Sequence, residues 1–586
     1  MLDTLSDDIS EDLLGQAIDE AVGAHMLEEV SSGWERYRFS HALVQETLSE
    51  ELSTRRRVRL HGRIAEALED LYGADAEAHA AELAHHFAEA KAALGHEKMV
   101  HYSLLAGEQA LAAYAHEEAL PHFQRGLTAK GAALAGTAPA GDAETAELLF
   151  GLGKAQQGTQ ERLWSGPEVF ACFHRAFDYY VGAGDAGRAV DIAAHHISSN
   201  IGGELIAKAL ELVPPDSHDA GRLLSRYIMP LRAEYERAQE AFHRALAIAQ
   251  QQQDLDLEMM TLVAGACIEY VECHFQESLD HNLRAIELAD RVDHPDAEAH
   301  ARYDLMHVLY IMGDLEGAAL QATAMLSPAK RSGIRAWQTN AMEANGDVAS
   351  ARGDWKAARE FTEQGLAVDP RHTVLLGSRA LLEYQVGDFD AGEAYLEQLL
   401  ESIQRGQSEP STPVTMATPW YAAPVVLISV VAYITGVATR FDVAEAIADR
   451  AVSSPFVQLG VQNAARMGLA LMAVQRGDAL GAGELYTALV SMRGTMFPQS
   501  PLGHALSADR ILGLLSHTMG GLDRAADHFE DSLTFCRKAG YRPELAWTCC
   551  DYADTLLQRN GPGDREMAMS LLDDSLAIST ELGMRP

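Results

Sequence analysis

Apolar residues recur every three to four positions along most of the chain, and short polar turns interrupt them at intervals. This period is that of an amphipathic helix. Each turn pairs glycine, which adopts positive φ just past a helix end, with a residue that can cap the next helix. The pattern therefore predicts helix–turn–helix hairpins. Six turns share it: AGDAGRA (183–189), MGDLEGA (312–318), RGDWKAA (352–358), VGDFDAG (386–392), RGDALGA (476–482) and MGGLDRA (519–525).

A small residue follows the turn glycine at a fixed offset. Five positions after the glycine, five of the six turns carry alanine: Ala189, Ala318, Ala358, Ala482 and Ala525. A side chain of this size lets the two helices of a hairpin approach closely. The pattern differs at 386–392, where the alanine, Ala391, comes one position earlier and Gly392 stands at the fifth position.

The spacing of the turns indicates a repeat architecture. Gly353 lies 40 residues after Gly313, and Gly387 follows after another 34. The 90-residue gap after Gly387 contains TRFDVAEA (439–446), where Phe441 keeps its offset although Thr-Arg replaces Gly-Asp. Two helices per unit with a period between 34 and the mid-forties are typical of a tetratricopeptide-like solenoid.

The second helices strengthen this resemblance to tetratricopeptide repeats. ERAQEAFHRALAIA (236–249) and EEALPHFQRGL (117–127) carry alanine and phenylalanine at the family's spacing. The resemblance covers roughly residues 80–586 and implies an all-α superhelix. Its concave groove would bind a protein partner, a peptide or a small inducer.

Composition divides the chain into four predicted parts. Residues 1–72 are expected to form a partial winged-helix segment and a junction helix, and 73–405 a first solenoid arm. A Pro/Ser/Thr-rich linker at 406–420 cannot continue a helix, and 421–586 would form a second arm. Within the first arm, GAALAGTAPAGDA (131–143) is predicted to be a flexible connector.

The apolar run PVVLISVVAYITGVA (424–438) tests whether the chain enters a membrane. It is shorter than the roughly 20 residues that a spanning helix needs. The hairpin signal TRFDVAEA follows it directly. We therefore expect the first, buried helix of another hairpin and no membrane span.

The N-terminal region has a different pattern. EDLLGQAIDEAVGAHMLEEV (11–30) predicts an amphipathic helix, GWERYRF (33–39) a strand, and HALVQETLSEEL (41–52) a second helix. Ser40 stands where an N-cap belongs. A nucleophile elbow would need glycines where Arg38 and Ala42 stand, so catalysis at Ser40 is not expected.

Residues 13–130 resemble the end of the winged-helix domain and its junction with the repeat arm in bacterial STAND-class ATPase regulators, which include large LuxR-type activators. The motifs RYRFSHALVQETL, RRRVRLHGRIAEALE and AELAHHF stand in the family's order. The resemblance implies a sensor arm that works with an ATPase domain, in cis or in trans. No ATPase domain is evident in the sequence.

The same resemblance suggests a role for His41. In the wider class a Met-His-Asp motif opens this helix, and its histidine contacts the β-phosphate of bound ADP. Ser40-His41-Ala42 takes that place here, so only the histidine matches. Two interpretations of His41 stay open: a nucleotide-sensing residue, or a side chain that helps to pack the junction.

Charge narrows the possible partners. The chain has 46 Lys and Arg against 85 Asp and Glu, a formal charge of −39, which excludes non-specific nucleic-acid binding by the bulk surface. One basic cluster stands out on a predicted helix, and it is a solvated face, a docking surface for an acidic partner such as an ATPase domain, or a DNA contact, which the acidic charge of the whole chain opposes. Its members are Arg55, Arg56, Arg57, Arg59 and Arg63.

Compartment signals are few. Six scattered cysteines do not make a disulfide framework in a chain of 586 residues, which favours a reducing compartment. The acidic N-terminus lacks the pattern of a signal peptide. We expect a cytoplasmic protein.

Motifs of enzymatic chemistry are incomplete. FGLGKAQQG (150–158) differs from a P-loop because Leu148 replaces the first glycine and Ala155 the Ser/Thr. The histidines of HEKMVH (96–101) lie five apart, on different helix faces, and Cys267 and Cys273 lack a second ligand pair at zinc spacing.

The sequence thus indicates no catalytic residue, no metal site and no cofactor. It favours a non-enzymatic binding module, the sensor or scaffold arm of a STAND-type signalling or transcriptional regulator. A free-standing tetratricopeptide adaptor is the alternative. An enzyme with a pocket between the two arms is a further alternative, for which the sequence offers no acid, base or nucleophile.

Overall fold

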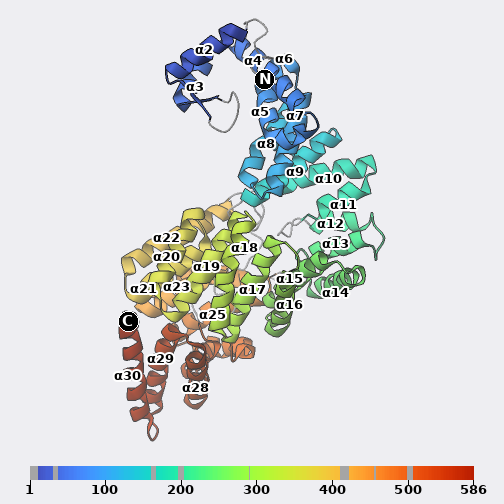
Figure 1. Ribbon diagram of the computed structural model, residues 1–586. Helices are drawn as coiled ribbons and strands as arrows, with labels where there is room; N and C mark the ends of the chain where they lie inside the picture. Colours follow the sequence, from blue (N-terminus) through green and yellow to red (C-terminus); the bar gives the residue numbers. More distant parts are fainter. Residues whose placement is uncertain are drawn as a thin grey trace. The chain divides into compact units, whose positions relative to one another are not determined.

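The computed structural model describes residues 11–30, 37–159, 167–195, 203–289, 291–408, 422–453, 457–497 and 506–585. It divides into two compact units. Unit 1 comprises Met1–Gln156 with Ala171–Asp185, and unit 2 comprises Gln157–Phe170 with Ala186–Pro586. Helices dominate both units in the described part of the chain (Figure 1).

Unit 1 contains a small two-stranded sheet followed by helices. Its elements are α2 (Glu11–Gly23), β1 (Leu27–Glu29), β2 (Tyr37–Phe39), α3 (Ala42–Glu51), α4 (Thr54–Tyr72), η1 (Gly73–His79), α5 (Ala80–Glu89), α6 (Lys91–Leu94), α7 (Glu97–Ala112), α8 (His116–Ala129), α9 (Ala143–Thr159) and α10 (Pro167–Ala183); the last residues of α9 and the first of α10 group with unit 2.

The first helix is shorter than the sequence pattern predicts. It ends at Gly23, and Leu27–Glu29 forms a strand that pairs antiparallel with Tyr37–Phe39. His25 adopts a positive φ of 57°, which reverses the chain between helix and strand. The prediction of a continuous helix over 11–30 is therefore wrong after Gly23. The predicted strand is confirmed at Tyr37–Phe39.

Ser40 does not cap the following helix. Its hydroxyl donates to the backbone carbonyls of His25 and Met26, the second at 3.2 Å. The carbonyl of His41 accepts the first helical bond of α3, from Val44 N at 3.0 Å. The capping prediction is wrong because this hydroxyl is bonded to the turn before β1 and not to the first amides of α3.

The connector between α8 and α9 is non-helical, as the sequence indicates, but it is tied to α10. Arg175, which is almost fully buried, donates from Nε to the carbonyl of Ala138 and from Nη1 to that of Ala133, both at 2.8 Å. The amide of Ala140 donates to the Arg175 carbonyl at 3.1 Å. These bonds hold a segment whose backbone groups form no helix or strand hydrogen bonds.

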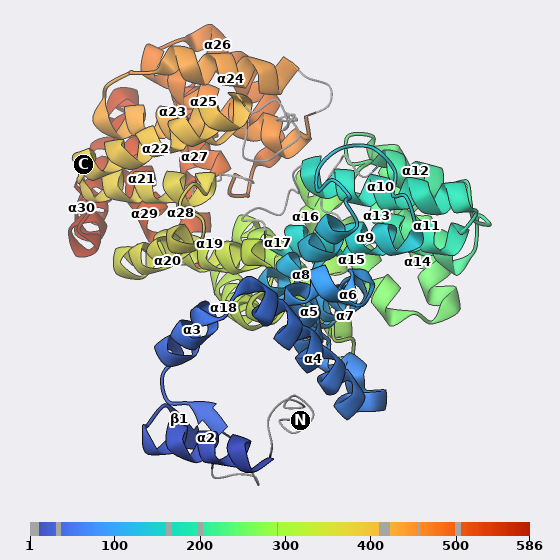
Figure 2. The ribbon, with the colours of Figure 1, turned by 90° about the horizontal axis from the view of Figure 1, so that it is seen from above.

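Unit 2 is a row of helical hairpins (Figure 2). Its elements are α11 (Ala186–Ala193), α12 (Gly203–Leu210), α13 (His218–Tyr227), α14 (Tyr235–Gln252), α15 (Leu255–Val271), α16 (Phe275–Ala289), α17 (Pro295–Met312), α18 (Leu315–Arg331), α19 (Arg335–Arg352), α20 (Trp355–Val368), α21 (Thr373–Val386), α22 (Phe389–Ser408), α23 (Ala423–Thr435), α24 (Phe441–Ser453), α25 (Leu459–Arg476), α26 (Ala479–Leu489), η4 (Val490–Met492), α27 (Ala508–Thr518), α28 (Leu522–Ala539), α29 (Arg542–Arg559) and α30 (Asp564–Leu582).

From α13 to α30 these helices form successive pairs. The odd-numbered helix of each pair contacts the odd-numbered helix of the next, so these first helices form an inner layer and the second helices an outer one. This is the arrangement of an all-α, tetratricopeptide-like solenoid.

The turn chemistry predicted from the sequence is confirmed at four hairpins of unit 2. Gly313, Gly353, Gly387 and Gly477 end their helices with φ between 65° and 85°. The aspartate after each glycine accepts a backbone N–H of the next helix at 2.9–3.2 Å. Three of the hairpins carry a fully buried alanine five positions after the glycine, namely Ala318, Ala358 and Ala482.

The irregular turn at 386–392 has a packing explanation. Gly392 stands at the offset of the alanines in the other hairpins, and the ring of Tyr384 occupies the space that a Cβ at this position would need. The larger neighbouring side chain therefore requires glycine here.

The apolar run after the predicted linker forms α23, the first helix of a hairpin, as expected. It ends at Gly436 (φ 69°), and every residue from Ala423 to Ala432 is buried. None of the described helices has the length and apolar character needed to cross a membrane. The predicted linker itself lies outside the described residues, apart from its first residues, which belong to the end of α22.

Unit 2 closes on itself. In an open solenoid each repeat contacts only its neighbours, but here α19 also contacts α29 and α15 contacts α25. Hydrogen bonds join the last hairpin to the middle of the row: Trp355 Nε1 donates to the Leu582 carbonyl at 2.8 Å, and the Arg585 amide donates to the Gln385 carbonyl at 3.2 Å. A single hydrophobic cluster extends from Leu376 to Leu571.

Candidate functional site

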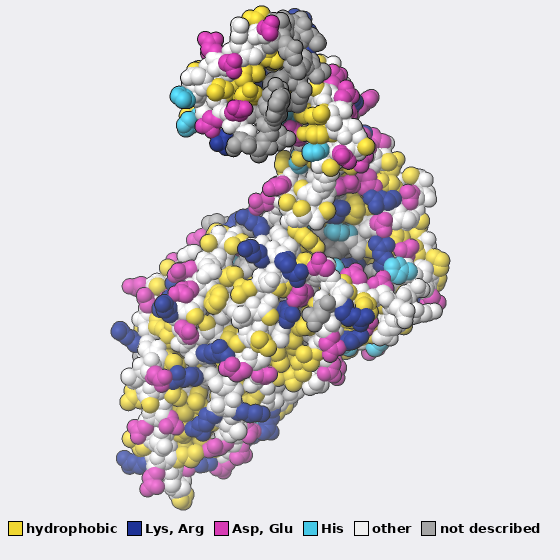
Figure 3. Space-filling model, viewed as in Figure 1, with side chains coloured by type: hydrophobic (Ala, Val, Ile, Leu, Met, Phe, Trp, Pro, Cys, Tyr) yellow, Lys and Arg dark blue, Asp and Glu magenta, His cyan; other side chains and the backbone are white. Residues whose placement is uncertain are grey.

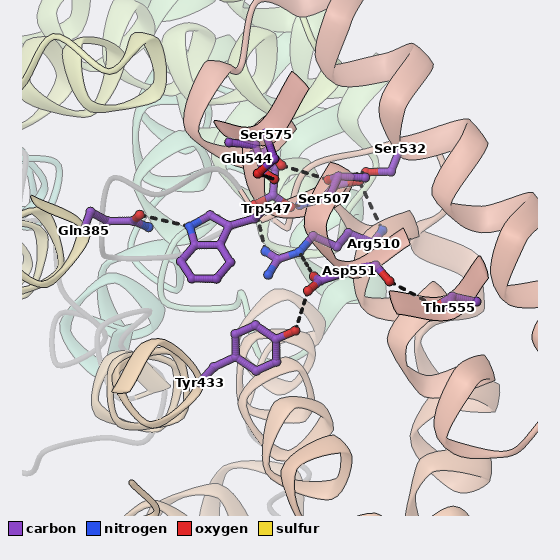
Figure 4. A network of polar contacts seen from close by, with 12 residues as sticks. Gln385, Tyr433, Ser507, Arg510, Ser532, Glu544, Trp547, Asp551, Thr555 and Ser575 are labelled. Carbon is purple, nitrogen blue, oxygen red and sulfur yellow. Dashed lines mark hydrogen bonds and ion pairs between the residues drawn. The ribbon is translucent and has the colours of Figure 1, made fainter. Parts of the chain in front are cut away.

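A buried polar network lies in the inner layer of unit 2, where the last hairpins meet the middle ones (Figure 4). Its centre is Arg510 on α27, which is 3% exposed. Arg510 Nη1 donates to Glu544 Oε2 at 2.9 Å, and Nε donates to Asp551 Oδ2 at 2.6 Å. Both carboxylates lie on α29, seven residues and thus two helical turns apart, so they face Arg510 together.

Two aromatic side chains complete the network. Tyr433 on α23 donates its hydroxyl to Asp551 Oδ1 at 2.7 Å, and Trp547 Nε1 donates to Gln385 Oε1 on α21 at 3.0 Å. The Arg510 guanidinium lies 5.5 Å from the Tyr433 ring centroid and 5.6 Å from that of Trp547. Cation–π attraction is strong where water is excluded. Four inner helices are therefore joined by polar contacts at one point.

The start of α27 places Arg510. Ser507 caps this helix by accepting the Arg510 amide at 3.4 Å, and its own amide donates to Glu544 Oε1 at 2.7 Å. Ser532 donates its hydroxyl to Ser507 Oγ at 2.9 Å. The cap and the carboxylate together fix the rotation of α27 about its axis.

Charge in the network is unbalanced. Burial alone would lower the pKa of Arg510, but Glu544 and Asp551 more than reverse this and raise it. Burial raises the pKa of Glu544 to about 7, although Arg510 opposes the shift. One guanidinium thus faces two carboxylates, and the network as a whole favours an additional positive charge or a proton.

A small cavity adjoins the network. The cavity has a volume of about 20 Å³, which is enough for about one water molecule and too little for a peptide. Its lining comes from six inner helices and the segment before α27, namely Ser350, Ala351, Gln385, Val430, Tyr433, Ile434, Leu471, Leu506, Arg510, Pro543, Glu544 and Trp547.

The arginine cluster lies at the start of α4 in unit 1. Ser53 caps the helix by accepting the Arg56 amide at 3.4 Å. Arg55, Arg56 and Arg59 are exposed, whereas Arg57 and Arg63 are half-buried. The first turn of α4 carries no acidic residue. The side chains of Arg55, Arg56 and Arg57 therefore lie at the positive end of the helix dipole, where a positive charge is unfavourable.

His41 is exposed between β2 and α3. Its carbonyl accepts the first helical bonds of α3, but none of the described hydrogen bonds involves its ring. Both the nucleotide-sensing and the packing interpretation of His41 stay predictions.

The P-loop-like stretch is part of a helix, as expected. Gly151 and Gly153 lie within α9, and a Cβ at either position would overlap a phenylalanine ring, that of Phe123 or Phe173. These glycines therefore serve close helix packing. Backbone amides within a helix are already bonded and cannot wrap a phosphate.

The cysteine and histidine motifs of the sequence do not form the ligand sets that they suggest. His96 and His101 are both exposed and belong to none of the described clusters of possible metal ligands. Cys267 approaches His300 and Asp304, which lie on α17 and belong to no shared motif.

The Arg510 network was missed by sequence reasoning. Asp509 and Arg510 interrupt an apolar helical run, and Glu544, Trp547 and Asp551 recur at helical spacing on α29. Such charged residues at expected core positions are a usable signal. Their partners Tyr433 and Gln385, however, are more than 70 residues away in the chain, so pairing could not be inferred.

The surface around these sites is mixed in charge. Figure 3 shows acidic and basic side chains intermingled over the face of unit 2 that it presents. Elsewhere in unit 2, opposite charges pair between neighbouring helices, as in Arg476 with Glu445 and Arg352 with Glu316. The acidic excess is thus spread and forms no single patch on that face.

Comparison with known proteins gives structural likenesses with low sequence identity. No protein-family model matches the chain, and no curated protein matches it. Among solved structures, the APC/C hetero-tetramer Cut9-Hcn1 is similar over 92% of this chain and 92% of its own, with 15% identity and a TM-score of 0.48. A Rap protein complexed with Competence and Sporulation Factor is similar over 60% of this chain and 97% of its own, with 13% identity and a TM-score of 0.38.

A third similar structure is a STAND protein with a tetratricopeptide repeat sensor from Pyrococcus horikoshii. It matches 75% of this chain and 58% of its own length, with 15% identity and a TM-score of 0.33. Such likenesses concern the helical-repeat fold alone. Neither a ligand nor a partner of this chain follows from them.

Proposed function

We propose that this protein is a non-enzymatic binding module whose unit 2 recognises a peptide, a protein segment or a small inducer at its inner face. The observation that carries the proposal is the Arg510 network, which holds the last hairpins against the middle ones through polar contacts. A ligand whose polar groups replace the contacts of this network can separate the last hairpins from the middle ones. Binding then changes the shape of the solenoid without any chemical step.

The energetics of buried charge support a switching role. A buried ion pair contributes little to stability compared with well-packed apolar side chains, because desolvation offsets the attraction. Arg510 and Glu544 are each about 97% buried, in an inner layer that is otherwise rich in alanine and leucine. Closure through such pairs specifies one arrangement and can be exchanged for an equivalent set of contacts.

Excess negative charge indicates the type of ligand. The network has one guanidinium for two carboxylates and favours a further cation. A basic side chain or amino group of the ligand would supply it. We expect ligands of unit 2 to carry at least one positive charge.

The closure can be tested with two tryptophan variants and a matched control. Trp547→Phe and Trp355→Phe keep an aromatic ring but remove the bonds to Gln385 and Leu582. Trp337→Phe removes a bond to Asp296 within the hairpin row and is the control. Hydrogen exchange of α29 and α30 should accelerate in the first two variants and stay unchanged in the third.

Ligands can be sought by display of random peptides on the full chain. Peptides recovered with wild type should carry basic residues and should lose binding to Glu544→Gln, which removes one of the two carboxylates that would receive the added charge. Arg565→Met, on the exposed side of α30, is the control. Peptides that bind all variants equally, or bind only outer helices in cross-linking, would contradict an inner-face site.

We further propose that the chain is the sensor or scaffold arm of a STAND-type regulator in a reducing, cytoplasmic compartment, with α4 docking an ATPase domain in cis or in trans. The arginines at the start of α4 oppose its dipole, which is understandable if they serve an acidic partner. Pull-down with wild type and with Arg55, Arg56 and Arg59 replaced by glutamine tests this. Recovery of the same ATPase by both proteins would remove the docking role of these arginines, whereas recovery of no ATPase by either protein would favour a free-standing adaptor.

A further inference from the structure

A second polar cluster lies in the inner layer of unit 2, on α17 and α19. One ring nitrogen of His307 and one carboxylate oxygen each of Glu343 and Asp347 lie within 4.8 Å of one another. Glu343 and Asp347 are four residues apart and share a face of α19. Ligand atoms bonded at about 2.0–2.2 Å to one tetrahedral Zn²⁺ ion lie about 3.3–3.6 Å apart, so these side chains would need only small shifts to share an ion.

Each side chain of the cluster is oriented by a neighbour. His307 Nδ1 donates to the Tyr303 carbonyl at 2.9 Å, which leaves the lone pair of Nε2 available. Tyr303 donates its hydroxyl to Glu343 Oε1 at 2.9 Å, and Ser378 lies 3.5 Å from Asp347 Oδ1. Metal-binding histidines and carboxylates in proteins are held by this kind of outer contact.

One ligand atom lacks a partner. Glu343 is 1% exposed, and its Oε2 has no hydrogen bond among the described residues. His372 Nε2 lies 3.9 Å from this oxygen, within ion-pair range but too far for a hydrogen bond. A buried carboxylate oxygen without a donor is costly unless a cation or a proton reaches it.

The charges of the cluster suit a divalent ion, because the two carboxylates of Glu343 and Asp347 can balance its two positive charges in a buried place.

A comparable cluster in the same unit shows the contrast. In the group of Asp509, His528 and Asp531, the His528 ring bonds through both nitrogens, to Asp509 at 2.9 Å and to Tyr486 at 3.0 Å. Asp531 pairs with Arg493 at 2.6 Å. Its hydrogen-bonding groups are already satisfied, so that cluster has no need of an ion.

We propose that His307, Glu343 and Asp347 bind one divalent transition-metal ion, with Zn²⁺ as the preferred ion. One nitrogen and two oxygen ligands suit Zn²⁺, whereas Mg²⁺ and Ca²⁺ prefer sites built of oxygen alone. The ion would cross-link α17 and α19 through their inner faces. Water or a ligand would supply the remaining coordination.

Calorimetric titration of chelator-treated full-length protein with ZnCl₂ and with MgCl₂ tests the proposal. We expect one tight Zn²⁺ site, no comparable Mg²⁺ site, and a rise of the thermal midpoint with Zn²⁺. Glu343→Gln and His307→Gln should each weaken Zn²⁺ binding at least tenfold. Tyr303→Phe, which removes only an outer contact, should weaken it by roughly 10-fold to 100-fold.

Two controls separate this site from other histidine clusters. His528→Gln changes the satisfied group, and His85→Gln changes the group of His61, His85 and His86 in unit 1. Both should retain wild-type Zn²⁺ affinity at the proposed site. Visible absorption of bound Co²⁺ gives a second readout, and it should disappear in His307→Gln.

Failure of the proposal is equally clear. A wild-type protein that takes up no Zn²⁺, or Glu343→Gln and His307→Gln variants that bind it as wild type does, would overturn it. The first result would mean that the two carboxyl groups are neutralised by protons. Loss of binding in His85→Gln alone would move the ion to unit 1.

Discussion

Tyr433 and Asp551 lie 118 residues apart in the chain and share a 2.7 Å hydrogen bond in the inner layer of unit 2. This bond joins α23 to α29, and Arg510 approaches the other oxygen of the same carboxylate at 2.6 Å. The closure of the solenoid therefore depends on a few groups whose removal can be measured.

Replacement of Arg510 should destabilise unit 2 strongly. Arg510→Met leaves Glu544 and Asp551 buried without their cation, which typically lowers the free energy of unfolding by about 3–5 kcal/mol. Urea denaturation followed by circular dichroism measures this. Arg565→Met on the exposed side of α30 should change it by less than about 0.5 kcal/mol.

Neutralising the carboxylates should restore part of that loss. The triple variant Arg510→Met, Glu544→Gln, Asp551→Asn contains no unpaired buried charge, so we expect it to be more stable than Arg510→Met alone. If the triple variant is as unstable as the single one, packing around the Arg510 stem rather than charge dominates the site.

The glycines of α9 should not tolerate a side chain. Gly151→Ala places a methyl group inside the contact distance of the Phe123 ring. Overpacking of this kind lowers stability by about 1–3 kcal/mol. Gly182→Ala, where a Cβ meets nothing within 4 Å, is the matched control and should be neutral or slightly stabilising in thermal denaturation.

Unit 1 should lose stability as pH falls below about 6.5. Burial lowers the pKa of both His61 and His86 from 6.5; Glu89 opposes the shift in both residues, and His85 adds to it. The folded state thus favours their neutral form, and the unfolded chain binds more protons at acid pH. The stabilising contribution is present above the unfolded pKa and is lost as pH decreases toward the folded values.

Calorimetric scans at pH 7.5 and 5.5 check the histidine effect. The double variant His61→Gln, His86→Gln should show a smaller decrease of its first transition between these pH values than wild type. An equal decrease in both proteins would assign the acid sensitivity to other groups.

Charge reversal at the start of α4 should stabilise the helix while weakening docking. Glutamate at positions 55 and 56 would interact favourably with the N-terminal dipole, where Arg55 and Arg56 do not. We expect a gain of about 0.3–1 kcal/mol for each replacement. Thermal denaturation gives the stability, and pull-down of an ATPase partner gives the binding.

A gain of stability together with a loss of partner binding would show that Arg55 and Arg56 serve binding at the expense of helix stability. A solvated helix face without a partner would show the stability gain alone. Arg63→Gln lies on the same helix beyond its first turn. This variant therefore shows how loss of a positive charge affects docking without the influence of the helix dipole.

The sequence by itself determined the repeating unit. Glycine at 313, 353, 387 and 477 and aspartate after it specify a local turn, because positive φ and an N-cap depend only on neighbouring backbone. Helical period and buried alanine then define the hairpin. The same local reasoning failed at Leu27–Glu29, where pairing with a strand ten residues away replaced the helix.

Only the tertiary structure decided how the hairpins close and which polar groups meet. Arg510, Tyr433 and Gln385 come together because each bonds to a side chain of α29, and no local pattern encodes contacts between elements so distant in the chain. His307 and Glu343 meet only across the α17–α19 pair of inner helices. Solenoid curvature accumulates from small rotations at every repeat, so these juxtapositions depend on the whole row and not on any single motif.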